Sequence, residues 1–157
     1  MKHTISVLVE NKFGVLARVA GLFSARGYNI ASLAVSETLD PTISYMTIVV
    51  EAQDEKILEQ ISKQLNKLID VITVTDFTKK AHLDRELLLL KVGYSQKEKQ
   101  KLESLLSKCV GKIVQAKDDT AIIEAVGDQA QIRQLLEGLN ELGIKELVRT
   151  GRLAITY

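Results

Sequence analysis

The spacing of apolar residues along the first half of the chain predicts a series of strands and helices. Alternation predicts a strand over 4–10, and helical spacing then predicts a helix that ends at Gly27, a residue suited to the left-handed helix stop. Asp54 is expected to cap a second helix. The later elements of this half are predicted as strands over 30–37 and 44–52, a helix over 54–68 and a strand over 71–77. The order is βαββαβ.

The second half repeats this order after a polar connector. Ser95 and Glu98 have the spacing of a capping box at the start of a helix, and Asp128 is placed to cap another. A break with a bulge is expected near Gly151 in the last strand. The predicted elements are strands over 86–92, 113–117 and 121–126, helices over 95–109 and 128–142, and a last strand in two pieces, 144–148 and 153–157.

These patterns predict an α+β protein with two ferredoxin-like βαββαβ sandwiches, in domains 1–79 and 80–157. Each has two helices on one face of a four-stranded antiparallel sheet. The other face of the first sheet is predicted to be too apolar for free solvation, which favours oligomerisation. The residues assigned to that face are Ser6, Leu8, Leu33, Val35, Val49, Thr73 and Thr75.

Composition narrows the functional classes. With 46% hydrophobic residues in 157, and 21 basic against 20 acidic groups, the chain is neither disordered nor basic enough for a nucleic-acid footprint. No apolar run approaches the length of a membrane span, and we expect no signal or transit peptide. We expect Cys109 in the core, and His3 and His82 at the surface. These three residues give neither a disulfide nor a zinc cluster nor a nucleophile relay.

Two segments are candidates for ligand binding. Gly14 opens the first helix, where unpaired N–H groups suit a carboxylate and glycine allows close approach; the alternative is an ordinary turn in which Asn11 caps the backbone. Asn29 carries a donor and an acceptor for an amino acid, and Ile30 offers an apolar wall; the alternative is a helix-exit turn. The equivalent turn of the second half, at Gly93, lacks these features and is expected to bind no amino acid.

The whole chain closely resembles the small regulatory subunit of acetolactate (acetohydroxyacid) synthase, whose N-terminal part is an ACT domain. The resemblance implies a non-catalytic subunit that activates a separate large catalytic subunit in branched-chain amino acid biosynthesis and confers feedback inhibition by valine. It implies no cofactor in this chain, with thiamine diphosphate, magnesium and FAD in the catalytic partner. A homodimer in the bacterial cytoplasm, or in the plastid stroma, is expected. The matching segments are 3–11, 14–19, 21–30, 40–44, 46–50, 59–61, 63–65, 67–68, 84–87 and 149–151.

The resemblance also implies the site. Valine is expected between two ACT domains paired edge to edge, with the residues from the first loop in one protomer and those from the second segment in its partner. The implied contacts are Asn11, Gly14, Val15 and Leu16 from one protomer, and Asn29 and Ile30 from the other. Departures from the family pattern at Ala17, Ala31 and Tyr45 bear on affinity and effector choice. A free-standing ACT-type amino-acid sensor and an enzyme are the alternative classes.

Overall fold

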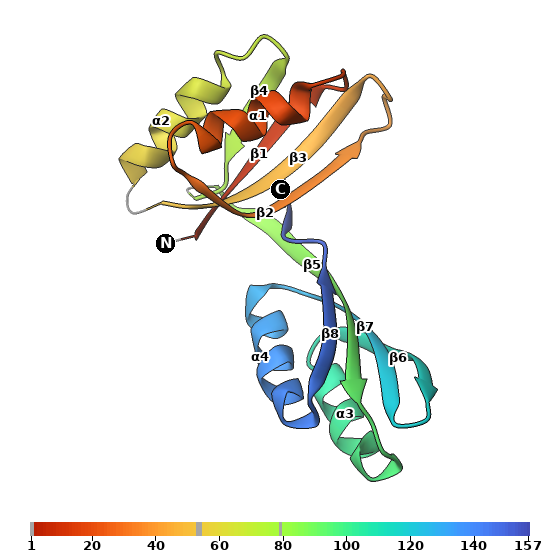
Figure 1. Cartoon of the computed structure of the whole chain (residues 1–157). Coiled ribbons are helices and arrows are strands. Elements are labelled where there is room, and N and C mark those ends of the chain that lie inside the picture. Colours follow the sequence, from red (N-terminus) through yellow and green to blue (C-terminus); the bar gives the residue numbers. More distant parts are fainter. Residues whose placement is uncertain (1, 53–54, 79) are drawn as a thin grey trace. The chain divides into compact units, whose positions relative to one another are not determined.

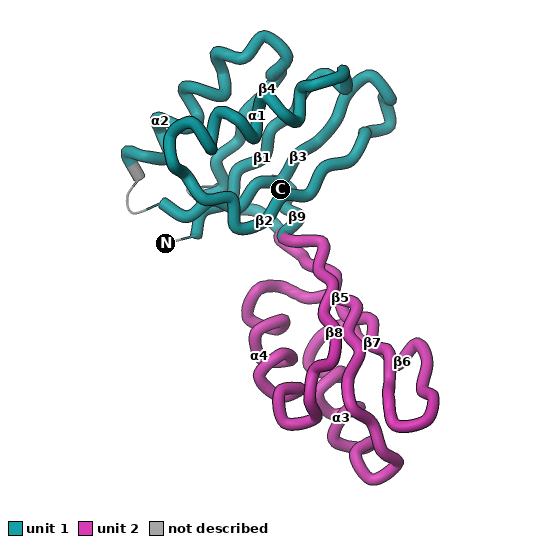
Figure 2. Tube along the Cα trace, viewed as in Figure 1, with its two compact units in different colours: residues 1–83, 152–157 teal, residues 84–151 magenta. Residues whose placement is uncertain are grey.

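The computed structural model describes residues 2–52, 55–78 and 80–157, which form two compact units (Figures 1 and 2). The first unit contains the residues up to Leu83 together with Arg152–Tyr157, and the second contains Asp84–Gly151. The predicted boundary after residue 79 therefore differs from the observed one, and the last six residues return to the first unit.

The first unit has the predicted element order, and its sheet is antiparallel with the strand order β2-β3-β1-β4. This is the ferredoxin-like arrangement, with both helices on one face of the sheet (Figure 1). The predicted cap Asp54 lies outside the described residues. The elements are β1 (Lys2–Glu10), α1 (Val15–Ser24), β2 (Asn29–Glu37), β3 (Ile43–Glu51), α2 (Glu55–Leu65) and β4 (Val71–Asp76).

The core of this unit lies between the sheet and its two helices. Alternate β1 residues point into it, as the period of two requires, and apolar residues at helical spacing on α1 and α2 pack against them. Gly27, at φ 69°, ends α1 in the left-handed region as predicted. The buried core residues include Ile5, Val7, Val9, Val19, Phe23, Met46, Ile48, Leu58, Ile61 and Leu65.

A bulge in β2 changes which of its residues face the helices. The register between β2 and β3 shifts between Ile30 and Ser32, so Leu33 lies opposite Ile48 and packs against the core. Val35 has the same parity as Leu33 and faces the same side. The prediction that these two residues lie on the outer face is therefore wrong, because a bulge reverses the alternation beyond it.

The C-terminal strand β9 (Leu153–Thr156) contacts the outer face of the first sheet. The Tyr45 hydroxyl donates to the Ala154 carbonyl at 2.9 Å, and Arg152 Nη1 donates to Thr4 Oγ1 at 2.9 Å. Val49, which lies opposite Thr4 in the sheet, is only 3% exposed. The chain itself thus covers part of the face for which a second copy was expected.

The second unit repeats the ferredoxin-like order, with strands in the order β6-β7-β5-β8 and β9 paired to β5. The last strand is broken near Gly151 as predicted, into β8 in this unit and β9 (Leu153–Thr156), which belongs to the first unit rather than to the second. The elements are β5 (His82–Gly93), a 3-10 turn (Gln96–Glu98), α3 (Lys99–Leu106), β6 (Val110–Lys117), β7 (Thr120–Gly127), α4 (Gln129–Leu139), a 3-10 turn (Asn140–Leu142) and β8 (Ile144–Arg149).

Side-chain hydrogen bonds cap the start of α4 and the start of the 3-10 turn that precedes α3. Asp128 caps α4 by accepting from the Gln131 N–H at 2.9 Å, as predicted, and the Glu98 carboxylate accepts from the Ser95 N–H at 3.0 Å. Helix α3 ends at Leu106, so Cys109 lies in the following turn rather than on the helix. Its side chain still packs against the core of the second unit, and burial raises the pKa of the thiol.

An ion pair joins β5 to β8 where the second unit begins and ends. Arg149 donates from Nε and Nη2 to the two carboxylate oxygens of Glu86, at 2.8 and 2.7 Å. The next residue, Thr150, accepts the Leu87 N–H on its hydroxyl at 3.1 Å. Two segments that carry the family resemblance, 84–87 and 149–151, therefore hold each other in place.

Candidate effector-binding site

The β1–α1 loop (Asn11–Gly14) leads into α1 through a left-handed residue. Gly14 occupies the N-cap position at φ 80° and ψ −5°, and no side chain caps the helix there. The first N–H groups of a helix have no partner within the helix and carry partial positive charge. Gly14 therefore both permits the turn and leaves a helix end suited to a small carboxylate.

The residues around Gly14 divide between core and solvent. Val15 is 3% exposed and belongs to the core, and its N–H donates to the Lys12 carbonyl at 3.3 Å. Leu16 is 45% exposed, and Phe13 is fully exposed. Of these, Leu16 and Phe13 present apolar side chains beside the loop, whereas Val15 anchors it.

An ion pair supports the loop from the side of the β4 strand. Arg18 donates from Nε to Asp70 Oδ2 at 2.9 Å, and its Nη2 lies 2.7 Å from the same oxygen. Asp70 is 7% exposed, and its backbone carbonyl accepts the Glu10 N–H at 2.9 Å. The absence of a side chain on Gly14 makes room for this arginine, because an added Cβ would lie 3.1 Å from Arg18 Nη1.

Asn11 fixes the other side of the loop to the β2–β3 turn. Its side-chain Nδ2 donates to the Pro41 carbonyl at 2.8 Å, and its backbone N–H donates to the Thr42 carbonyl at 2.7 Å. The loop and the turn thus lie at the same end of the sheet (Figure 1). Asn11 therefore holds the turn together, and its role as a valine contact stays a prediction.

Asn29 and Ile30 lie at the opposite end of the same sheet. Asn29 pairs with Glu51 and donates to its carboxylate at 3.3 Å, whereas Glu10 pairs with Ile43. Eight residues along β3 separate these positions, about 26 Å at the usual rise of a strand. The structure therefore does not bring the two predicted halves of the site together within one unit.

The edge of the sheet offers a geometric solution. β2 is an edge strand, and it runs parallel to β1 because both are antiparallel to β3. An antiparallel pairing of two β2 edges about a two-fold axis places the Asn29 end of one copy beside the Glu37 end of the other. The β1–α1 loop lies at that Glu37 end, because Glu37 pairs with Ser44 and Glu10 with Ile43.

The corresponding turn of the second unit is filled by its own backbone. A Cβ at Gly93 would lie 2.6 Å from the Leu142 carbonyl oxygen, and the Gly93 N–H donates to the Gly143 carbonyl at 3.0 Å. Close backbone contact, rather than ligand access, explains the glycine here. The absence of amino-acid binding in the second half stays a prediction.

The structure corrects the prediction for His3, whereas His82 is half-buried at the surface. His3 is only 7% exposed, and its Nδ1 lies 3.3 Å from Thr78 Oγ1; the His82 ring packs on Phe77 with centroids 5.0 Å apart.

Across residues 2–52, 55–78 and 80–157, no three His, Cys, Asp or Glu side chains gather as a metal site. Within those same ranges, no helix has the length and apolar character to cross a membrane.

Comparison with known proteins covers both units. The AHAS small subunit-like ACT domain family matches residues 5–73, and the family described as the small subunit of acetolactate synthase matches residues 85–157. The probable acetolactate synthase small subunit of Archaeoglobus fulgidus is 47% identical over 155 residues, covering 99% of this chain and 96% of the relative. The acetolactate synthase small subunit of Aquifex aeolicus is 44% identical, covering 98% and 80%.

A solved structure agrees over the full length. The acetolactate synthase small subunit of Thermotoga maritima superposes with a TM-score of 0.87 at 36% identity, covering 100% of this chain and 98% of the other. Together with the two family matches, this likeness extends through both ferredoxin-like units. The chain belongs to the acetolactate synthase small-subunit family, as a regulatory, non-catalytic subunit built on an ACT domain.

Proposed function

We propose that the chain forms a homodimer that activates the acetolactate synthase catalytic subunit and makes it sensitive to feedback inhibition by valine. Thiamine diphosphate, magnesium and FAD then reside in the catalytic subunit, and the complex works in the cytoplasm or plastid stroma. The observation that supports the homodimer and its shared valine site is the position of the two predicted half-sites at opposite ends of one sheet, in which β2 is an edge strand.

Valine fits the chemistry of the two half-sites. Its carboxylate suits the uncapped end of α1 at Gly14, and its branched side chain suits the exposed Leu16. Asn29 of the partner then faces the ammonium and carboxylate groups, with Ile30 as an apolar wall. A ligand with so few atoms buries little surface, so we expect a Kd between about 1 μM and 1 mM.

The direct test is calorimetry of the full chain with L-valine, with D-valine as the control for stereospecific binding. Addition of the chain to the catalytic subunit should raise acetolactate formation, and valine should then lower it. Absence of heat with valine, leucine and isoleucine at millimolar concentration would contradict the effector role while leaving activation intact.

A mixed dimer tests whether the site lies between protomers. Gly14→Asp damages the loop half and Asn29→Ala damages the strand half, so each homodimeric variant should lose both sites. A dimer with one protomer of each kind keeps one intact site, formed by the unchanged loop of one protomer and the unchanged strand of the other. Binding of about one valine per mixed dimer supports the shared site, and no binding shows that each site lies within one protomer.

A further inference from the structure

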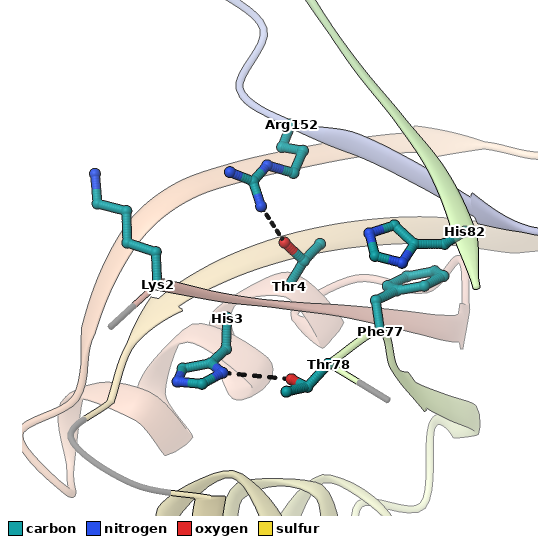
Figure 3. Close-up of a pocket in the computed structure, with 7 residues that line it drawn as sticks. All are labelled: Lys2, His3, Thr4, Phe77, Thr78, His82 and Arg152. Atoms are coloured by element: carbon teal, nitrogen blue, oxygen red, sulfur yellow. Dashed lines mark hydrogen bonds between the residues drawn. The ribbon is translucent and has the colours of Figure 1, made fainter. Parts of the chain in front are cut away.

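A pocket of about 160 Å³ lies in the first unit, away from the β1–α1 loop. It occurs at the start of β1, where the chain leaves β4 and where the C-terminal segment meets the sheet (Figure 3). The volume accommodates a small molecule. Its seven lining residues are Lys2, His3, Thr4, Phe77, Thr78, His82 and Arg152.

The lining is basic. It contains one lysine, one arginine and two histidines, together with two hydroxyls, and none of the seven side chains is a carboxylate. Lys2 and Arg152 extend from the same side of β1 (Figure 3). Arg152 is oriented by its hydrogen bond to Thr4 Oγ1 at 2.9 Å and engages other groups as well. The positive charge is thus contributed by both ends of the chain.

The two imidazoles add polar groups to the lining. His82 Nδ1 lies 2.8 Å from the Lys80 carbonyl, which only accepts, so the proton of the neutral ring is on Nδ1. His3 is only 7% exposed, and its Nε2 has no hydrogen-bond partner among the described residues. The His3 ring and Thr78 lie on the side of β1 opposite Lys2 and Arg152 (Figure 3), so the groups that gather on one side are Lys2, Thr4 and Arg152.

We propose that this pocket binds a phosphate group. A tetrahedral dianion accepts hydrogen bonds from several directions, which matches an ammonium, a guanidinium and the Thr4 hydroxyl on one side of β1 better than a planar carboxylate does. The site is separate from the proposed valine site and does not depend on it. Because Arg152 precedes β9 and Lys2 begins β1, the bound anion also holds the C-terminal segment against the first sheet.

The test is calorimetry of the full chain with sodium phosphate, in a phosphate-free buffer, against sodium chloride at equal ionic strength. We expect saturable binding, and we expect Lys2→Gln to weaken it roughly tenfold, as for loss of one charged hydrogen-bond donor. Lys12→Gln is the matched control: it removes the same charge from the other end of β1, where Lys12 pairs with Glu10. This control should bind phosphate as the parent does.

Two further ligands identify the source of the phosphate. Glycerol phosphate binding more tightly than inorganic phosphate assigns the site to a phosphorylated metabolite, and equal binding assigns it to free phosphate. Acetate that binds as tightly as phosphate overturns the proposal, as does the lack of saturable phosphate binding or unchanged affinity in Lys2→Gln. Arg152→Gln, checked for an unchanged fold by circular dichroism, should weaken binding at least as much as Lys2→Gln.

Discussion

Replacement of Gly14 by aspartate should separate inhibition from activation. The substitution adds a carboxylate and a Cβ at the end of α1, where the carboxylate of valine is proposed to bind. Valine should then bind poorly, whereas activation of the catalytic subunit should persist, because the valine-free state is the active one. The acidic group itself is favourable at a helix N-terminus, so the helix should still form.

The structure gives the expected size of two effects of Gly14→Asp, the loss of folding stability and the loss of valine binding. At φ 80° a residue with a Cβ costs about 1–2 kcal/mol, which is small against the usual 5–15 kcal/mol of folding. The new Cβ meets only Arg18 Nη1, at 3.1 Å, and the end of an arginine side chain can move. Two carboxylates about 4 Å apart repel by about 4 kcal/mol in a partly screened site. Arg18 offsets part of this repulsion, so we expect at least roughly a hundredfold rise in the valine concentration for half inhibition.

The assay is acetolactate formation by the reconstituted complex as a function of valine. Gly21→Asp is the matched control, because it adds the same charge to α1 at a position where, apart from its chain neighbours and the adjoining backbone of α1, no described atom lies within 4 Å of the new Cβ. It should leave inhibition unchanged. Thermal unfolding of both variants checks that each is folded.

Unchanged valine inhibition in the purified Gly14→Asp complex would refute the placement of the effector at Gly14. Loss of activation together with inhibition would assign the glycine a structural role instead, through the Arg18–Asp70 ion pair beside it. Loss of inhibition in Gly21→Asp as well would show that added charge on α1, rather than its position, causes the effect.

Three further substitutions or treatments test the fold. Tyr45→Phe removes the hydrogen bond to Ala154 and should lower the free energy of unfolding by about 1 kcal/mol in urea titrations; no change would show that β9 contributes little there. Asp128→Ala removes the cap of α4 and should cost about 1 kcal/mol by the same measurement, unless water replaces the cap fully. Because burial raises the pKa of Cys109, iodoacetamide at pH 8 should alkylate the folded chain more slowly than the urea-unfolded chain, and equal rates would contradict that burial.

The features predicted best from sequence depend on neighbours within a few residues. The helix stop at Gly27 and the cap at Asp128 are of this kind, and both are confirmed. The element order is confirmed for the same reason, because periodicity is a local property. The Leu33 assignment failed because one extra residue in β2 is decided by pairing with β3, which local alternation does not reveal.

Long-range packing explains the other differences. The glycine at 151 predicts the break between β8 and β9, but only tertiary contacts assign β9 to the first unit. His3 precedes the first apolar residues of β1 and is buried by Thr78 and its neighbours, 75 residues later in the chain. For the candidate site, the sequence located both segments, but their positions at opposite ends of the sheet follow from the strand order.

The return of β9 makes the first unit a discontinuous domain, with the second unit inserted between Leu83 and Arg152. The inserted unit begins and ends side by side, because Leu88 pairs with Arg149 and the Leu87 carbonyl accepts the Thr150 N–H at 3.1 Å. Its removal therefore requires only a short turn in its place, and both chain ends remain in the ACT unit (Figure 2). A simple truncation after residue 79, in contrast, removes the strand that covers the ACT sheet. The second unit is thus an insertion into the ACT unit at a single point, between Leu83 and Arg152.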